Sequence, residues 1–368
     1  MLVTAAVAPS KGAPLEIREL ELAPLRPDEV RVKMVASGVC HTDAIVRDQL
    51  YPTPLPAVLG HEGAGIVTEV GSMVASVAVG DKVVLSPNSC GHCRHCLTGH
   101  PSYCVEMYDR NFGGRRPDGT TAFSEKGKAV SSTFFGQSSF SSYADVAMRS
   151  VVKVEPDAPL ELLGPLGCGL QTGAGGVLNV LQPVPGSSFV VFGSGAVGLA
   201  GLLAAKVAGC TTLIAVDLVP SRLALAKELG ATHVIDSSKE DPVAAIRELT
   251  DGGADSILET TAVPAVLRQA AESLAIRGTV ALVGAAAPGK EVTFEIGESL
   301  TRGWNFRTVI EGDAVSQVFI PQLIALWKQG RFPFDKLVGF YALEDINQAF
   351  ADSASGKTIK PIIRFAQA

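Results

Sequence analysis

The sequence has few charged residues and no large excess of either sign. Only 18% of its 368 residues are Asp, Glu, Lys or Arg, and the formal net charge is −6. Such a chain lacks the general attraction that polyanions require, so we expect neither nucleic acid nor a membrane as its partner. With 47% hydrophobic residues it is unlike a disordered chain, and its length indicates about two domains.

The sequence also lacks a recognisable targeting or membrane-spanning segment. Residues Met1–Pro9 are apolar, but the stretch is short and has no basic residues. The stretch Leu162–Ala205 contains no charged residue, yet prolines, glycines and amides interrupt it. Such a stretch is typical of a buried strand and helix rather than of a membrane span. We therefore expect a cytoplasmic protein.

Three regions of the chain differ in pattern. Short strands and turns up to about residue 153 predict an all-β region, within which Ser86–Ser142 forms a very long loop. Strand–helix units then repeat to about Gly303, and the nearly all-apolar strands indicate a parallel sheet covered on both faces. The remaining C-terminal part is too short for a large core, so we expect it to pack on the first region. The predicted strands are Ser188–Phe192, Thr212–Val216, His233–Ile235, Ser256–Glu259 and Thr279–Val283, and the predicted helices are Ala196–Ala208, Ser221–Leu229, Pro242–Leu249 and Pro264–Leu274, with Ser221 as a helix cap.

Four of the seven cysteines lie within one short segment. Thiolates two residues apart in tight turns can converge on one ion, and four of them complete a closed tetrahedral zinc shell. The spacing differs from that of iron–sulfur proteins, and the alternative is a group of free buried thiols. We predict a structural zinc that fastens the long loop, bound by Cys90, Cys93, Cys96 and Cys104, with Gly91 and Gly99 in the turns.

A glycine-rich segment follows the first strand of the parallel region. Its residues are Gly193, Ser194, Gly195, Ala196, Val197 and Gly198. They open an apolar helix, and Asp217 ends the next strand, as in a dinucleotide-binding fingerprint. Asp217 would bind the adenine ribose and repel a 2′-phosphate, which favours NAD over NADP, although Arg222 could tolerate a phosphate. The alternative is a glycine turn without a ligand.

A third group is spread along the chain as Cys40, His61, Glu62 and Cys168. A catalytic zinc needs three protein ligands and an open position, which Cys and His side chains can provide. Taken singly, His61 could instead be a core histidine and Cys168 a small buried apolar residue.

The motifs around these residues, taken together, resemble those of a known family. The segments Gly60-His61-Glu62-x2-Gly65-x5-Gly71, Gly80-Asp81-Lys82-Val83, the four-cysteine loop, Gly164-Pro165-Leu166-Gly167-Cys168-Gly169 and the glycine-rich fingerprint occur in the order found in zinc-containing medium-chain alcohol dehydrogenases. The stretches Leu55–Glu62, Phe135–Phe140 and Gly330–Asp335 are most similar to the bacterial aryl-alcohol (benzyl-alcohol) branch, to which geraniol dehydrogenases are close relatives. The resemblance covers essentially the whole chain.

The resemblance implies a fold and a division of the chain. It implies an α/β protein in which a Rossmann domain, a doubly wound parallel sheet that binds NAD, is inserted into an all-β GroES-like catalytic domain. The expected bounds are 1–165 and 305–368 for the catalytic domain and 166–304 for the Rossmann domain. It also implies a homo-oligomer, a dimer or alternatively a tetramer, in which the edge strand near Thr301–Val309 pairs with its copy.

The resemblance also assigns roles to single residues. Cys40, His61 and Cys168 would bind a catalytic zinc, with Glu62 behind it and Asp43 orienting His61. Thr42 would take the proton from the alcohol, His41 would contact the cofactor pyrophosphate, and Thr172 would lie near the nicotinamide. Ile45 stands where many animal and plant members have a proton-relay histidine, so the proton route beyond Thr42 is open.

These roles imply an NAD-dependent dehydrogenase with two zinc ions per chain. The expected substrates are aromatic or allylic primary alcohols, with geraniol-type or other long-chain alcohols as the alternative. Phe134, Phe135, Phe140 and Tyr51 would line a pocket for a flat ring or, alternatively, be ordinary core or subunit-contact aromatics. The remaining alternatives are a zinc-free quinone reductase of the same superfamily and a catalytically silent NAD-binding protein, and the intact ligand sets argue against both.

Overall fold

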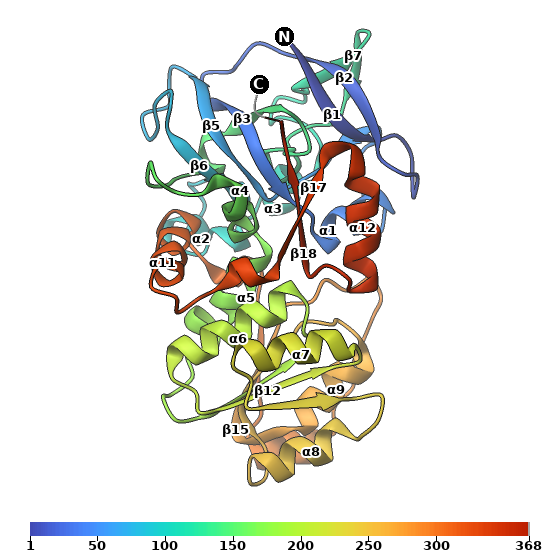
Figure 1. The fold of residues 1–368 in the computed structure, drawn as a ribbon, viewed down its shortest axis with the longest axis vertical. Coiled ribbons are helices and arrows are strands. Elements are labelled where there is room, and N and C mark those ends of the chain that lie inside the picture. Colours follow the sequence, from blue (N-terminus) through green and yellow to red (C-terminus); the bar gives the residue numbers. More distant parts are fainter. Residues whose placement is uncertain (367–368) are drawn as a thin grey trace. The chain divides into compact units, whose positions relative to one another are not determined.

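The computed structural model describes residues 1–366, which form two compact units. Among the described residues, the first unit contains 1–168, 315–322 and 337–366, and the second contains 169–314 and 323–336. This division differs from the sequence-based one at 166–168, 305–314 and 323–336. The difference at 305–314 arises because the last strand of the parallel sheet lies beyond residue 304. The colours of Figure 1 trace the chain from the first unit into the second and back into the first.

The first unit is built on two β-sheets, as the alternating and β-branched segments predict. Nearly all of the pairings are antiparallel, and the apolar faces of the sheets enclose one core. The C-terminal strand pairs with β3, as Ile363 lies opposite Ser37, so the end of the chain returns to this unit. The smaller sheet has the order β4 (Ala57–Val58), β1 (Leu2–Ala8), β2 (Glu16–Leu22), β7 (Phe123–Glu125) and β8 (Lys128–Val130). The larger has the order β10 (Val151–Lys153), β6 (Lys82–Leu85), β5 (Gly63–Val70), β3 (Glu29–Gly38), β18 (Lys360–Arg364) and β17 (Val338–Ala342), with β9 (Tyr143–Ala147) on β3.

Short helices of the first unit lie in the connections between these strands. The long loop after β6 is not structureless, because two helices and a hairpin interrupt it. The helices are α1 (His41–Arg47), α2 (Arg94–Leu97), α3 (Met107–Phe112), α4 (Leu160–Leu163) and α12 (Ile346–Ser355).

The second unit contains one six-stranded sheet in which every pairing is parallel. In chain order the strands run 3-2-1-4-5-6, which is the order of a Rossmann sheet. Its strands are β13 (His233–Asp236), β12 (Thr212–Asp217), β11 (Ser188–Phe192), β14 (Ala254–Glu259), β15 (Leu274–Leu282) and β16 (Asn305–Thr308). α5 (Gly169–Gly175) precedes the first strand, and α11 (Ser316–Lys328) follows the last and is divided between the two units. The helices that connect the strands are α6 (Ala196–Ala208), α7 (Pro220–Leu229), α8 (Pro242–Leu249), α9 (Pro264–Glu272) and α10 (Ile296–Arg302).

The strands and helices expected in the second unit are therefore present, but some details differ. β15 begins at Leu274 rather than at Thr279, so the helix expected over Pro264–Leu274 ends at Glu272. Ser221 does not cap α7: the capping position is Val219, and Pro220 occupies the first turn, where its missing N–H costs nothing. Gly230 ends the helix in the left-handed conformation, with φ of 117°.

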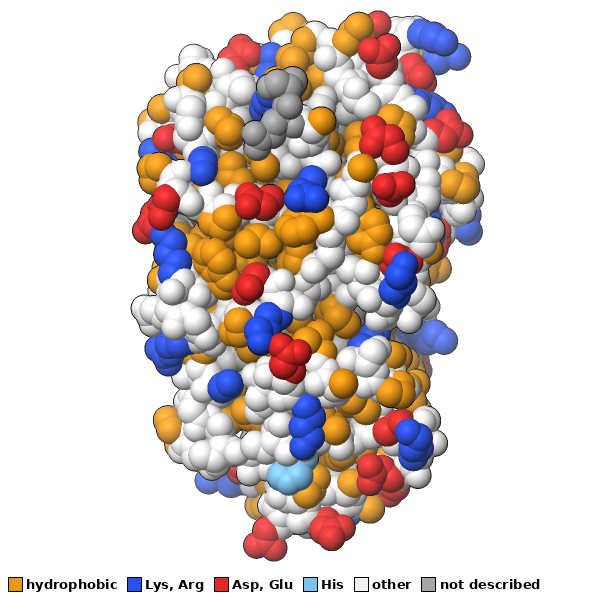
Figure 2. Space-filling model, viewed as in Figure 1, with side chains coloured by type: hydrophobic (Ala, Val, Ile, Leu, Met, Phe, Trp, Pro, Cys, Tyr) orange, Lys and Arg blue, Asp and Glu red, His pale blue; other side chains and the backbone are white. Residues whose placement is uncertain are grey.

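The surface agrees with the low charge of the sequence. On the face shown in Figure 2, acidic and basic side chains are interspersed and form no extended patch of one sign. None of the helices within residues 1–366 combines the length and the apolar character that crossing a bilayer requires.

Candidate active site and metal sites

Loops around the core of the first unit bring four distant residues together. Cys40 lies between β3 and α1, His61 and Glu62 precede β5, and Cys168 follows a short 3₁₀ turn. One ligand atom from each of these four residues lies within 4.8 Å of those of the others. Three of the residues are buried and Cys40 is half-buried, so the set forms a largely enclosed site.

The imidazole of His61 is oriented for a ligand on one nitrogen. Its Nδ1 lies 2.8 Å from Oδ1 of the fully buried Asp43, which also accepts from the backbone N–H groups of Cys40 and Gly60. The Nε2 atom is buried and has no hydrogen-bond partner among residues 1–366. A buried nitrogen without a partner is costly, and a metal ion at this point would satisfy it.

The electrostatics of this set favour ionised ligands. A hydrogen bond from Cys168, together with the charges of His61 and Lys360, holds the pKa of Cys40 well below its usual value despite burial. Burial alone would lower the pKa of His61, but the charges of Asp43 and Cys40 outweigh it and raise that pKa well above its usual value. Without a metal the set therefore stabilises a thiolate on Cys40 and a proton on His61, and a bound cation would take the place of that proton.

The carboxylate of Glu62, beside the other ligands, is held in an ion pair with a buried lysine. Lys360, which is 3% exposed, donates to both carboxylate oxygens at 2.9 and 3.0 Å and to the carbonyl of Val39 at 3.2 Å. A Cβ on Gly38 would collide with the same carboxylate, so this close approach requires glycine. Sequence reasoning missed Lys360, although a lysine opening an apolar terminal strand is an available signal.

Thr42 lies next to the set but not in it. Its hydroxyl is 3.8 Å from the sulfur of Cys40, and its side chain is half-buried at the start of α1. His41 is exposed, and Ile45 is buried on the same helix. The position of the missing relay histidine is thus apolar and closed to solvent.

Two of the predicted pocket aromatics lie against His61. Phe135 stacks on the imidazole with ring centroids 4.5 Å apart, and Phe134 meets it edge-on at 5.4 Å. Phe140 is fully buried and contacts Phe350 instead, so it is a core residue. Tyr51 meets the ring of Phe112 edge-on, at the border of the same aromatic cluster.

The four clustered cysteines also converge. Their ligand atoms all lie within 4.8 Å of one another, and the sulfur of Cys96 is 3.9 Å from that of Cys90 and 3.5 Å from that of Cys93. Zn–S bonds of about 2.3 Å in a tetrahedron would place the sulfurs about 3.8 Å apart. Gly91 and Gly99 make the turns with φ of 80° and 87°. The geometry thus fits a closed zinc shell.

The thiols of this set differ in acidity. Backbone N–H groups of Cys96 and Val105 lower the pKa of Cys93 to about 6. Burial raises the pKa of Cys104 to about 12. A cation bound here has to displace protons from some of these thiols.

The glycine-rich turn of the second unit joins β11 to α6. Gly193 has φ of 90°, and a Cβ on Gly198 would collide with its carbonyl, so the sharp turn requires both glycines. The space in front of Gly195 is open, and the hydroxyl of Ser194 is buried without a partner among the described residues. The turn therefore leaves room and an available hydrogen-bonding group for a phosphate.

Asp217 ends β12 beside this turn. Its carboxylate accepts from the backbone N–H groups of Ser194 at 2.6 Å, Leu218 at 2.8 Å and Val219 at 2.9 Å. Arg222 lies 3.8 Å from it, and Thr172 is buried in α5 of the same unit. The predicted cofactor residues of this unit, Gly193, Gly195, Ala196, Val197, Gly198 and Asp217, are thus grouped at the carboxyl ends of β11 and β12.

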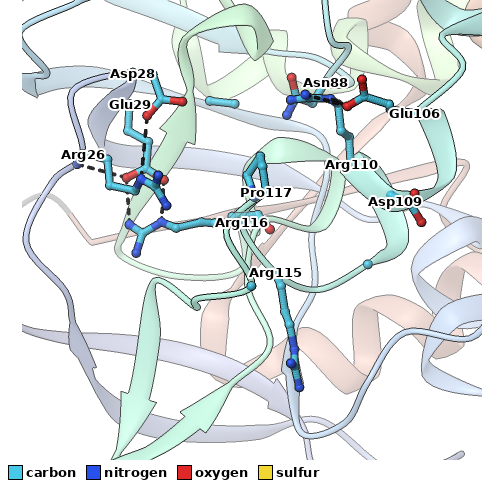
Figure 3. A pocket seen from close by; sticks show the side chains of 14 residues that line it. Arg26, Asp28, Glu29, Asn88, Glu106, Asp109, Arg110, Arg115, Arg116 and Pro117 are labelled. Atoms are coloured by element: carbon cyan, nitrogen blue, oxygen red, sulfur yellow. Dashed lines mark hydrogen bonds and ion pairs between the residues drawn. The ribbon is translucent and has the colours of Figure 1, made fainter.

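A separate polar cavity of about 410 Å³ lies in the first unit (Figure 3). Arg116 binds both oxygens of Glu29 at 2.6 and 2.7 Å, and Arg110 pairs with Glu106. None of the lining residues is one of the four cysteines or of the ligands around His61, although Glu106 lies at the edge of the four-cysteine set, where its N–H donates to the sulfur of Cys104 at 3.4 Å. The cavity is therefore not part of the sites described above.

Comparison with known proteins agrees with this geometry. The zinc-binding dehydrogenase model matches residues 196–328, and the alcohol dehydrogenase GroES-like domain model matches residues 26–156. A geraniol dehydrogenase from Castellaniella defragrans is 45% identical over 363 residues, which cover 98% of this chain and 97% of the relative. The chain belongs to the zinc-binding alcohol dehydrogenases.

Solved structures of this family are similar over the full length. Benzyl alcohol dehydrogenase from Acinetobacter calcoaceticus is 52% identical, with a TM-score of 0.97 and 100% of both chains covered. An alcohol dehydrogenase zinc-binding domain protein from Burkholderia ambifaria is 55% identical, with a TM-score of 0.98 and the same coverage. The expected family and fold, with GroES-like and Rossmann parts, are confirmed, and the chain is a zinc-dependent alcohol dehydrogenase.

Proposed function

We propose that this enzyme oxidises aromatic or allylic primary alcohols to aldehydes, reversibly, with NAD as hydride acceptor. The observation that carries the proposal is the enclosed set of Cys40, His61 and Cys168, in which Nε2 of His61 has no partner among the described residues. Two thiolates and an imidazole are a ligand set of catalytic zinc sites that keep one position open. Localisation in the cytoplasm and assembly as a dimer or tetramer belong to the same proposal.

The chemistry is divided between the bound groups and the protein. When bound, zinc supplies the Lewis acid for the alcohol oxygen, and NAD supplies the hydride acceptor. Asp43 keeps the proton on Nδ1 of His61, so that the lone pair of Nε2 faces the metal. The hydroxyl of Thr42, beside the sulfur of Cys40, accepts the alcohol proton. Ile45 offers no onward route, so the proton leaves Thr42 toward solvent or the cofactor ribose.

The choice of NAD rests on Asp217. Three backbone N–H groups hold its carboxylate, so its negative charge is fixed where an adenine ribose would lie. A 2′-phosphate would meet this charge at close range. Arg222 has its guanidinium 3.8 Å from the same carboxylate, which engages part of its positive charge. Ser194 and the turn around Gly195 fit the pyrophosphate.

The substrate class rests on the aromatic neighbours of His61 and on the relatives. Phe134 and Phe135 present apolar rings beside the ligand set, which suits a flat or unsaturated group. Benzyl alcohol and geraniol, which name two relatives, both carry the alcohol carbon on an unsaturated carbon. Such a neighbour stabilises charge that develops as hydride leaves, so conjugation would matter more than size. The second candidate is a terpenoid or other long-chain alcohol, favoured by the geraniol dehydrogenase relative.

A steady-state screen of alcohols with NAD and NADP tests the proposal. We expect kcat/KM to be higher for benzyl, cinnamyl and geranyl alcohols than for saturated alcohols of matched size, and higher with NAD. The ratio of benzyl alcohol to geraniol separates the two candidates. Better activity on ethanol than on benzyl alcohol would contradict the substrate class.

Metal analysis with two cysteine variants tests the site. We expect two zinc ions per chain, one of which is lost in Cys168→Ala together with turnover while the fold survives. Cys93→Ala should lose the other ion and reduce stability first, because that set holds the long loop. Full activity of Cys168→Ala would rule out the proposed catalytic set.

A further inference from the structure

Several left-handed residues are grouped in one short segment beside the proposed catalytic zinc set. Between residues 133 and 138, Thr133, Phe135 and Ser138 have φ of 60°, 50° and 53°, and Gly136 has φ of 69°. This left-handed conformation is unfavourable for residues other than glycine, and it persists only where the surroundings enforce it. Clustered strain of this kind is typical of functional sites.

Buried contacts enforce the conformation of this segment. The hydroxyl of Ser138 donates to the carbonyl of Val58 at 2.7 Å and accepts from the N–H of Phe134 at 3.0 Å. A Cβ on Gly136 would collide with Ser150, so the segment lies tightly against its neighbours. These contacts fix which way the side chains between them point.

Two side chains of the segment converge on His61. The ring of Phe135 covers one face of the imidazole at 4.5 Å with an interplanar angle of 27°. Gln137, which is 1% exposed, donates from Nε2 to the carbonyl of His61 at 2.9 Å and accepts at Oε1 from the N–H of Gly63 at 3.0 Å. The ring and the backbone of the same residue are thus held by one segment.

We infer that Phe135 and Gln137 are positioning residues that hold His61 in the orientation required for binding the catalytic metal. Asp43 holds Nδ1, the ring nitrogen that faces away from the metal. This single hydrogen bond still allows the imidazole ring to rotate about the Nδ1–Oδ1 direction and allows the backbone of His61 to move. The stacked ring restricts the rotation, and the paired amide contacts restrict the backbone. The inference rests on the proposed zinc assignment and adds the source of its rigidity.

Measurement of metal retention in two variants tests the inference. Phe135→Leu removes the stacked ring, and Gln137→Met removes both amide contacts at similar volume. Phe140→Leu is the matched control, because Phe140 is a fully buried ring close by that packs against Phe350 and the backbone of Gly60 and is not stacked on the imidazole. For each metal-loaded protein, release of zinc to a chromogenic chelator is followed in time, and the cobalt-substituted enzyme is examined by visible absorption.

We expect the catalytic metal to be lost about tenfold or more faster in both variants, within the range seen for residues that support metal ligands. The cobalt absorption bands should shift, because the imidazole leaves its orientation, while release from the four-cysteine set stays unchanged. Phe140→Leu should lower the melting temperature but keep the wild-type rate and spectrum. The two variants perturb different contacts, so a folding defect in one leaves the other informative.

Wild-type rates and spectra in both folded variants would overturn the inference, as would equal metal loss in Phe140→Leu. Failure of the wild-type enzyme to bind a second metal would instead overturn the proposed function as well. The two failures are therefore distinguishable in one set of measurements.

Discussion

Replacement of Lys360 by methionine should destabilise the first unit strongly. The lysine side chain is 4% exposed and that of Glu62 is fully buried, and the ammonium group is bound by both carboxylate oxygens. Methionine would leave a buried carboxylate without a counter-ion, close to the thiolate of Cys40. Breaking a buried ion pair in this way costs about 3–5 kcal/mol. The unfolded state of the first unit would then be populated roughly a hundred- to several-thousand-fold more often than in the wild-type protein.

The penalty should depend on pH in a defined direction. Burial raises the pKa of Glu62 above its ordinary value of 4.5, and the charge of Lys360 opposes that rise. Without the lysine the pKa rises further, so folding takes up a proton. The penalty is then complete above the raised pKa and shrinks as the pH falls through it toward 4.5.

Hydrogen exchange of β3 and β18 peptides measures this opening directly, whereas the two tryptophans, Trp304 and Trp327, report only on the second unit. The measurement should be made on metal-loaded and chelator-treated protein, because a bound metal offers the released carboxylate a second partner. Adding Glu62→Gln to Lys360→Met should recover much of the loss. Lys336→Met is the control, since its pair with Glu228 is exposed and its loss should leave exchange unchanged. A cost below about 1 kcal/mol in chelator-treated Lys360→Met would refute this reasoning, since it is the size expected of a surface pair.

Other features of the chain give further predictions. Asp217→Asn should shift the NAD-to-NADP ratio of kcat/KM at least about tenfold toward NADP, because close like charges cost several kcal/mol; an unchanged ratio in steady-state assays would contradict the cofactor assignment. Arg116→Met should lower the melting temperature by breaking the buried pair with Glu29, whereas Arg115→Met should not, since that side chain is exposed and points away from the pair (Figure 3). In zinc-stripped protein near neutral pH, Cys93 should be alkylated before Cys104, as their pKa values of about 6 and 12 require, and mass spectrometry would show the order.

The sequence predicts which residues form the two ligand sets better than it predicts the contacts that hold those residues in place. Cys40, His61 and Cys168 are recognisable because family motifs surround them, and the cysteine spacing marks the second set by itself. Apolar strands that alternate with helices also predict the parallel sheet, with the bounds of β11 and α6 reproduced as expected and the start of β15 five residues too late. The local pattern of apolar residues is sufficient there, because the conformation of each strand and each helix follows from the residues within it.

The supporting contacts could not be predicted in the same way. Lys360 lies 298 residues from Glu62 in the sequence, and Gln137 meets His61 through a turn in which Thr133, Phe135 and Ser138 are left-handed although they are not glycines. Nothing in the neighbouring sequence of either residue indicates its partner. The sequence leaves open whether the aromatic residues line a pocket or belong to the core, and only the structure separates Phe135, which stacks on His61, from Phe140, which packs against Phe350.

These supporting contacts also explain why the site should favour a metal. Two thiols and two carboxylates converge around His61, while Lys360 supplies a single fixed positive charge to balance Glu62. Without a cation, the site can limit the repulsion only by retaining protons on its thiols or on His61. A divalent ion would balance both thiolates and satisfy Nε2 at once. Its binding free energy would therefore add to the stability of the first unit, and chelation should weaken that unit before the second.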